Sequence, residues 1–187
     1  VGNLSHYASN MIFQQSGAKI KTIPVDSQGL VIDFIRKNFT KGSIRCVYVC
    51  SNRDYPTTTT LSAERRLELL QLAKEFQFAI IEDDFDYDFQ LEGSAMLPMA
   101  RSDANGLVIY LGKLGQSLFP SFQTGFVVAP ENLILEAKNY LQMLDRQGDL
   151  IPEQMLSELI YEGEMHRLVK KNGLVYKQRR DFLCECL

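Results

Sequence analysis

Short apolar runs alternate with amphipathic segments along the chain, and the two patterns predict strands and helices in turn. The run CVYVCS at residues 46–51 is continuous and apolar, which is typical of a strand buried on both faces. Further strands are predicted over residues 18–26, 78–84, 107–112 and 124–130. Helices are predicted over residues 10–16, 30–39, 63–76, 131–147, 152–161 and 164–187, the last one interrupted at Gly173.

The helix predicted over residues 63–76 has the clearest limits. Ser62 precedes it, and a serine in that place can accept a hydrogen bond from a free N–H of the first turn. We expect this helix to face the core with an apolar stripe at helical spacing, formed by Leu67, Leu70, Ala73 and Phe76.

The order of the predicted elements determines the expected fold class. Strands joined by helical crossovers of this length pair in parallel, with a right-handed connection. We therefore expect an α/β fold with a mainly parallel sheet flanked by helices. In such sheets ligands bind beyond the carboxyl ends of the strands. The loops that leave those ends cover residues 51–60, 83–90 and 112–123, so a site is expected there.

The composition is that of an ordinary globular chain. Of 187 residues, 45% are hydrophobic and 23% are charged, which excludes disorder, collagen and coiled coil for the chain as a whole. No apolar run approaches the roughly 20 residues of a membrane span, so no membrane partner is expected. The net charge of −3 argues against a surface that coats DNA. The first residue is not Met and the last residues lie within a helical pattern, so we expect a piece of a longer polypeptide.

The four cysteines do not form a recognisable framework. Cys46 and Cys50 share one face of a predicted strand because their spacing is even, and Cys184 and Cys186 lie near the end of the chain. CxxC pairs and nearby histidines are missing, so free or buried thiols are expected and a metal site is not. Such thiols fit a reducing cytoplasm.

Acidic residues crowd the end of the strand predicted over residues 78–84. The segment IIEDDFDYDF contains Glu82, Asp83, Asp84, Asp86 and Asp88. Like charges this close disfavour each other's ionised form unless a positive group lies nearby. Three interpretations stay open: a solvated acidic loop, a Mg²⁺ site with oxygen ligands, or one buried carboxylate that pairs with a protonated ring nitrogen of a cofactor.

A second segment, YLGKLGQSLFPSFQTGF at residues 110–126, combines glycines with polar side chains. Gly112 and Gly115 let the backbone approach a ligand closely. Lys113, Ser117 and backbone N–H groups can face an anion. A plain turn between two strands has the same composition, so both interpretations stay open.

Taken together, these segments occur in a recognisable order. They are YVCSNRDYPTTTTLSAERRLELLQLAKEF, IIEDDFDYDF, VIYLGKLGQSLFP and TGFVVAP. This order resembles the aminotransferase-like domain of MocR-type regulators of the GntR superfamily, over nearly the whole chain. The resemblance implies the type I fold of pyridoxal-phosphate enzymes. It also implies a partial large, cofactor-binding-like domain over residues 1–147 and the start of the small C-terminal domain over residues 148–187.

The resemblance assigns roles to residues around a bound pyridoxal phosphate. It pairs Asp83 with the pyridine nitrogen, where a carboxylate keeps the ring protonated and electron-withdrawing. Phe85 stands where the family usually has a tyrosine on the phenolic oxygen, and phenylalanine has no hydroxyl to donate. Tyr55 belongs to the same cofactor-binding set. The residues before it, Arg53 and Asp54, replace the usual His and Gln.

Three further positions concern the covalent bond and the phosphate. Gln116 aligns with the Schiff-base lysine of the family, and an amide nitrogen is not a usable amine nucleophile. Gln123 replaces the arginine that the family places on the phosphate, so a bidentate charge is lost. Lys113 stands where a small hydroxyl residue is common, and it either restores charge near the phosphate or supplies a displaced amine. Gln116 is either natural or an engineered change, and both stay open.

Two hypotheses follow from the resemblance. The first is an aminotransferase-like effector and dimerisation domain of a transcriptional regulator, without transaminase turnover because Gln116 replaces the lysine. The second is an active pyridoxal-phosphate-dependent aminotransferase that uses another lysine or a lysine at position 116 of a parent sequence. A metal-dependent enzyme built on the acidic cluster is a third and more distant hypothesis.

The resemblance also implies partners. It implies a homodimer and an amino-acid-like effector. DNA would be contacted only through a winged-helix domain that is not in this chain. The basic helical stretch over residues 166–180 is interpreted as a solvated helix face, with contact to nucleic acid as the alternative.

Overall fold

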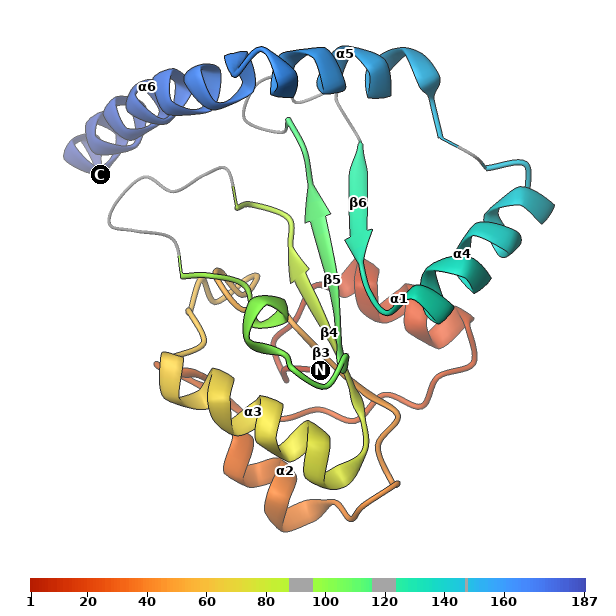
Figure 1. The fold of residues 1–187 in the computed structure, drawn as a ribbon. Coiled ribbons are helices and arrows are strands. Elements are labelled where there is room, and N and C mark those ends of the chain that lie inside the picture. The colour runs from red at the N-terminus through yellow and green to blue at the C-terminus, as the bar shows by residue number, and fades with distance from the viewer. Residues whose placement is uncertain (88–95, 116–123, 147) are drawn as a thin grey trace. The chain divides into compact units, whose positions relative to one another are not determined.

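A computed structural model describes residues 1–87, 96–115, 124–146 and 148–187 (Figure 1). Four strands form one sheet in the order β3-β4-β5-β6. Their bounds are Cys46–Val49 for β3, Ala79–Asp84 for β4, Val108–Lys113 for β5 and Gly125–Val128 for β6. β3 and β4 run parallel, with Cys46 opposite Ala79 and Val49 opposite Glu82. The sheet is mixed and mostly parallel, so the expected α/β class is confirmed.

Helices account for most of the remaining described chain. They are α1 (Tyr7–Gln15), α2 (Ile32–Asn38), α3 (Ala63–Phe76), α4 (Glu131–Met143), α5 (Leu150–Tyr161) and α6 (Glu164–Cys186), with a 3₁₀ turn η1 at Met99–Ser102. Helix α6 continues through Gly173, so the predicted interruption there is wrong. A glycine inside a helix costs only about 1 kcal/mol relative to alanine, which a helix of this length tolerates.

The strand predicted over residues 18–26 is wrong over most of its length. Only Val25–Asp26 forms a strand, β1, which pairs antiparallel with β2 at Gly29–Leu30. Upstream of β1, Ile23 makes an isolated parallel bridge with the N-terminal segment. Pro24 lies between these two pairings, and a proline has no N–H with which to continue a ladder.

Helix α3 begins where the sequence predicts, and of the predicted stripe it buries Ala73 and Phe76 but not Leu67. The Ser62 side chain accepts a hydrogen bond from the Arg65 N–H at 3.4 Å, so the predicted N-cap is confirmed. Leu67, which was expected in the buried stripe, is 63% exposed, and this part of the prediction is wrong. The residues that α3 buries are Arg66, Leu69, Leu72, Ala73 and Phe76.

The core lies between the sheet and the helices α2 and α3, which lie beside each other in Figure 1. Val47 of β3 and Ile80 of β4 are almost fully buried in it. Leu69 and Leu72 of α3 and Ile35 of α2 pack against the same cluster. This packing fixes β3 and β4 side by side, and therefore fixes where the loops after them begin.

The chain divides into two compact units. The first consists of Val1–Asp84, Met96–Leu111 and Val127–Pro130, and the second consists of Phe85–Ala95, Gly112–Phe126 and Glu131–Leu187. The domain division at residue 147 that the resemblance implies stays a prediction. Among the helices of the described residues, none combines the length and the apolar character that a membrane span requires.

Candidate functional site

The acidic cluster at the end of β4 is divided between two faces of the strand. Glu82 and Asp84 point to one face and are 0% and 1% exposed, whereas Asp83 points to the other and is half-buried. The interpretation of a solvated acidic loop is therefore wrong for Glu82 and Asp84. Asp86 is buried as well, and Asp88 lies outside the described residues. Within the described ranges, no group of three or more acidic, histidine or cysteine residues is placed to hold a metal ion.

Glu82 accepts hydrogen bonds from two parts of the chain. The Ser51 hydroxyl donates to its Oε1 at 2.5 Å, and the Met99 N–H donates to the same oxygen at 3.0 Å. The Ala100 N–H donates to Oε2 at 3.2 Å. A buried carboxylate needs such donors in place of water. Glu82 therefore ties the loop after β3 to the turn η1.

Asp84 is held in a similar way. The Asn52 amide donates to its two carboxylate oxygens at 3.0 and 3.1 Å, and the Tyr110 hydroxyl donates to Oδ2 at 3.0 Å. Asn52 leaves the end of β3, and Tyr110 belongs to β5. Asp84 thus links three neighbouring strands near their carboxyl ends, where a ligand is expected.

Arg66 supplies the positive charge behind these carboxylates. Its Nε donates to the Leu61 carbonyl oxygen at 2.9 Å, and one of its terminal nitrogens donates to the Ser51 carbonyl oxygen at 2.6 Å. The same nitrogen donates to the Asn52 side-chain oxygen at 2.9 Å. The other terminal nitrogen lies 3.9 Å from Glu82 Oε1. The pKa of Arg66 is lowered because burial disfavours the charged guanidinium, and the negative charges of Glu82 and Asp84 offset only part of this effect.

Asp83, on the opposite face of β4, receives a hydrogen bond from Tyr48. The Tyr48 hydroxyl lies 2.6 Å from Asp83 Oδ2 and 3.1 Å from Ser9 Oγ, and Ser9 Oγ lies 3.0 Å from His6 Nδ1. Burial, the neighbouring Cys50 and the bond to Asp83 raise the pKa of Tyr48 far above its usual value. Tyr48 is therefore a neutral donor, and it fixes the orientation of the Asp83 carboxylate.

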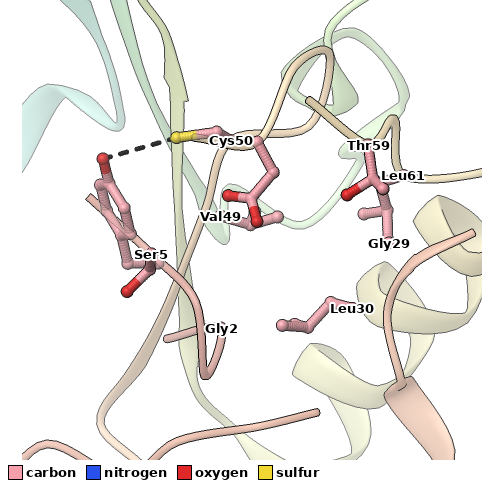
Figure 2. Close-up of a pocket in the computed structure, with 10 residues that line it drawn as sticks. Gly2, Ser5, Gly29, Leu30, Val49, Cys50, Thr59 and Leu61 are labelled. Carbon is pink, nitrogen blue, oxygen red and sulfur yellow. Dashed lines mark hydrogen bonds between the residues drawn. The ribbon is translucent and has the colours of Figure 1, made fainter. Parts of the chain in front are cut away.

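A small cavity lies beside this hydrogen-bonded chain (Figure 2). Its volume is about 10 Å³, which is room for one water molecule. Gly2, Ser5, Gly29 and Cys50 are among the residues that line it. The Cys50 thiol donates a hydrogen bond to the Tyr48 hydroxyl at 3.5 Å, and a dashed line at the Cys50 sulfur marks this bond in Figure 2. A space of this size holds no cofactor.

The structure places Tyr55 on the loop after β3. Its ring is exposed and lies edge-on to the His6 ring, with the ring centroids 5.7 Å apart. Asp54, next to it, is partly buried, and burial raises its pKa while a hydrogen bond from Thr57 lowers it. Asp83 and Tyr55 both belong to the first unit.

The other predicted site residues fall elsewhere. Phe85 and Lys113 belong to the second unit. Phe85 is exposed, and Lys113 is the last residue of β5 and partly buried. Gln116 and Gln123 lie outside the described residues. Their assigned roles stay predictions.

Sequence reasoning missed Tyr48 and Arg66. Tyr48 stands two residues before Cys50 in an otherwise aliphatic strand, and an aromatic hydroxyl in a buried strand needs a partner. Arg66 stands three residues before Leu69, on the stripe that is buried. An arginine at a core-facing helical position signals a buried acid, but the sequence does not say which acid.

Solved structures show the class of fold. This chain is similar to the multiple substrate aminotransferase from Thermococcus profundus, with 28% identity and a TM-score of 0.87, over 97% of this chain and 46% of that protein. An archaeal alanine:glyoxylate aminotransferase matches with 26% identity and a TM-score of 0.87, over 98% of this chain and 47% of that protein. The fold is that of the type I aminotransferases.

The curated relatives include both transcriptional regulators and an aminotransferase. The probable rhizopine catabolism regulatory protein MocR of Rhizobium meliloti is 28% identical over 88% of this chain and 33% of its own length. The regulator TauR of Rhodobacter capsulatus is 26% identical over 99% of this chain and 37% of its own length. An uncharacterized aminotransferase of Saccharolobus solfataricus, SSO0104, is 31% identical over 77% of this chain and 36% of its own length.

These relatives confirm the resemblance of the chain to the aminotransferase-like domain of MocR-type regulators. The chain spans about a third to two fifths of the length of these curated relatives. No family model matches it.

Proposed function

We propose that this chain is the aminotransferase-like effector and dimerisation domain of a transcriptional regulator, and that it does not catalyse transamination. The observation that carries the regulatory part is the coverage by MocR and TauR, which match 88% and 99% of the chain. The observation that carries the loss of turnover is Gln116 at the position of the Schiff-base lysine.

The cofactor expected for this fold is pyridoxal phosphate. One structural neighbour, the kynurenine aminotransferase of Pyrococcus horikoshii, was solved with PMP. The first unit fits the pyridine end of that group. Asp83 is partly buried, Tyr48 holds its Oδ2, and its Oδ1 has no hydrogen-bond partner among the residues described. A carboxylate oriented in this way can accept an N–H from a protonated ring.

When bound, pyridoxal phosphate withdraws electrons from the α-carbon of an amino acid. The contribution of this chain is to hold the ring proton at Asp83. Phe85 offers no hydroxyl to the ring, and Gln116 and Gln123 offer neither an amine nor a full positive charge. The residues therefore fit reversible, noncovalent binding better than turnover, because one lysine normally provides both the covalent link and the proton transfer.

Borohydride reduction tests this proposal on the full-length protein. The protein is mixed with pyridoxal phosphate, reduced, digested and examined by mass spectrometry. We expect no cofactor-labelled lysine in the wild type and a labelled peptide at position 116 in the Gln116→Lys variant. A wild-type peptide labelled at Lys113 contradicts the loss of the covalent link. An unlabelled Gln116→Lys variant contradicts the assignment of position 116.

A second candidate function is an active aminotransferase. The similarity to SSO0104 and to the solved aminotransferases favours it. It requires Lys113, another lysine, or a parent sequence with lysine at position 116. Conversion of pyridoxal phosphate to pyridoxamine phosphate by the full-length parent, dependent on an added amino acid, supports this function, and its absence rules the function out.

The remaining expectations belong to the same proposal. Residues 1–147 would form part of the large domain and residues 148–187 the start of the small one. The full-length regulator would be a cytoplasmic homodimer that responds to an amino-acid-like effector and contacts DNA through a winged-helix domain. Light scattering on the full-length protein tests the dimer.

A further inference from the structure

Tyr48 and Asp83 lie on the same face of the sheet, in diagonal positions on neighbouring strands. In the parallel pairing of β3 and β4, Tyr48 lies opposite Ile81. Asp83 comes two residues after Ile81, and residues two apart on a strand share a face. The Tyr48 side chain spans this diagonal, since its hydroxyl lies 2.6 Å from Asp83 Oδ2. The register of β3 against β4 thus brings the two side chains together.

Tyr48 is also held from helix α1 and from its own strand. Its side chain is buried, and its ring packs edge-on against Phe13 of α1 with the ring centroids 5.4 Å apart. Its hydroxyl lies 3.1 Å from Ser9 Oγ of α1 and accepts from the Cys50 thiol at 3.5 Å. A buried ring with these neighbours keeps its hydroxyl in one place beside Asp83.

The chemistry of the two ends fixes the direction of the hydrogen bonds. An ionised carboxylate can only accept, so the one proton of the Tyr48 hydroxyl goes to Asp83. The Ser9 hydroxyl must then donate to Tyr48, and the Nδ1–H of His6 must donate to Ser9. Every bond of this chain therefore points toward Asp83. Each donor polarises the next one, which strengthens the last bond, from Tyr48 to the carboxylate.

This arrangement uses one oxygen of Asp83 and leaves the other one available. Oδ2 accepts from Tyr48, and no other residue in the described part of the chain donates to Asp83. Burial raises the pKa of Tyr48, so its proton stays on the hydroxyl and is not lost to solvent. A carboxylate that is already oriented binds a ligand N–H without first paying the cost of ordering itself.

We propose that Tyr48 is the positioning residue for the ring of the cofactor. It holds Oδ2 of Asp83, aims Oδ1 at the protonated ring nitrogen, and so makes the site selective for rings that carry this nitrogen. Tyr48 acts through Asp83 and does not itself contact the ring. The inference rests on the proposed function, in which Asp83 receives the ring nitrogen.

Two probes that differ only at the ring nitrogen test the inference on the full-length protein. The first is pyridoxamine phosphate, which has no aldehyde and therefore cannot form a covalent link to any lysine. The second is its analogue with a C–H in place of the ring nitrogen. Calorimetric titration of the protein, freed of bound cofactor, gives the two dissociation constants. We expect the wild type to bind pyridoxamine phosphate at least about tenfold more tightly than the analogue, as for a hydrogen bond between charged groups.

The ratio of the two dissociation constants separates positioning from general support of the fold. Tyr48→Phe should lower the preference for the ring nitrogen at least about fivefold and leave binding of the analogue within about twofold of the wild type. A loss of local structure would weaken both probes and leave the ratio unchanged. Tyr161→Phe is the matched control, because Tyr161 is 92% exposed at the end of α5, and it should keep the wild-type ratio. Asp83→Asn should abolish the preference, since an amide is not an ionic partner.

Ser9→Ala gives a second, milder test of the same chain. It removes the donor to Tyr48 but keeps the Tyr48 hydroxyl and its bond to Asp83. The preference for the ring nitrogen should fall by about two- to threefold, because the Tyr48 hydroxyl becomes a weaker donor. If circular dichroism shows that Tyr48→Phe does not fold, Ser9→Ala decides the matter, and an unchanged ratio in that variant overturns the inference.

Failure of this inference can be told apart from failure of the proposed function. If wild type prefers pyridoxamine phosphate and Asp83→Asn does not, a folded Tyr48→Phe variant with the wild-type ratio overturns the role of Tyr48 alone. If the wild type does not bind pyridoxamine phosphate, or binds both probes equally, the assignment of Asp83 to the ring nitrogen is wrong. In that case the inference about Tyr48 is overturned together with it.

Discussion

Replacement of Arg66 by methionine is the sharpest test of the buried network below the candidate site. Arg66 donates to four protein oxygens at 2.6 to 3.1 Å and lies 3.9 Å from Glu82, and its side chain is 6% exposed. Arg66→Met keeps the apolar stem of the side chain and removes every donor. Glu82 then keeps its hydrogen bonds from the chain but loses the nearby positive charge.

The expected effect is large for a single substitution. Removal of one partner of a buried ion pair costs roughly 3–5 kcal/mol of free energy of unfolding. For a chain of this size, 1 kcal/mol shifts the Tm by roughly 2–4 °C, so the Tm of Arg66→Met should fall by about 6–20 °C. Urea denaturation followed by circular dichroism measures the free energy, and calorimetry measures the Tm.

A surface arginine provides the control. Arg36 pairs with Glu75 at 3.0 Å, but both side chains are about half exposed. Arg36→Met should therefore change the free energy of unfolding by less than about 1 kcal/mol. The double variant Arg66→Met with Glu82→Gln should recover part of the loss, because it removes the uncompensated charge. If Arg66→Met is no more destabilising than Arg36→Met, the buried network does not stabilise this fold.

Three further substitutions test other parts of the account. Tyr48→Phe should lower the free energy of unfolding by about 1–3 kcal/mol, measured in urea, because it leaves the partly buried Asp83 carboxylate without this donor. Tyr7→Phe on the surface should not have this effect, and equal effects contradict the role of the Tyr48 hydroxyl. Burial raises the pKa of Asp54 in the folded state above its ordinary 3.8, so the folded protein binds this proton more tightly than the unfolded chain does. The free energy of unfolding therefore falls as the pH rises from the unfolded-state pKa through the folded-state pKa. Asp54→Asn should therefore stabilise the protein at pH 7 and not below pH 3.8, and a gain that is independent of pH rules out this cause. Leu69→Ala should cost about 2–5 kcal/mol and Leu67→Ala less than about 1 kcal/mol, and the reverse order in urea denaturation contradicts the buried face of α3.

Local signals in the sequence determined the elements and the fold class. The apolar run of β3 and the Ser62 cap of α3 are properties of a few consecutive residues, which is why both are predicted close to their observed positions. The order of strands and helices determined the α/β class, because crossovers of this length admit few topologies. The same local order carried the resemblance that the curated relatives confirm.

The sequence left the orientation of side chains undecided. Leucines at positions 67, 69, 70 and 72 offer α3 two overlapping apolar stripes, and the one that is buried also includes Arg66. The choice depends on Glu82, which lies on a different element and meets Arg66 only in the folded chain. Helical periodicity depends only on the residues of the helix itself, so it cannot reveal a partner on another element.

The candidate site shows the same division. The sequence located the acidic cluster, since composition and spacing are visible in one dimension, and the resemblance to MocR-type regulators singled out Asp83 within it. The tertiary structure alone decided that Glu82 and Asp84 are buried and hydrogen-bonded to neighbouring segments. It also decided that Asp83 faces Tyr48 on the other side of the sheet. The reason is that a strand alternates its faces, and only the packing of helices against the sheet decides what each face meets.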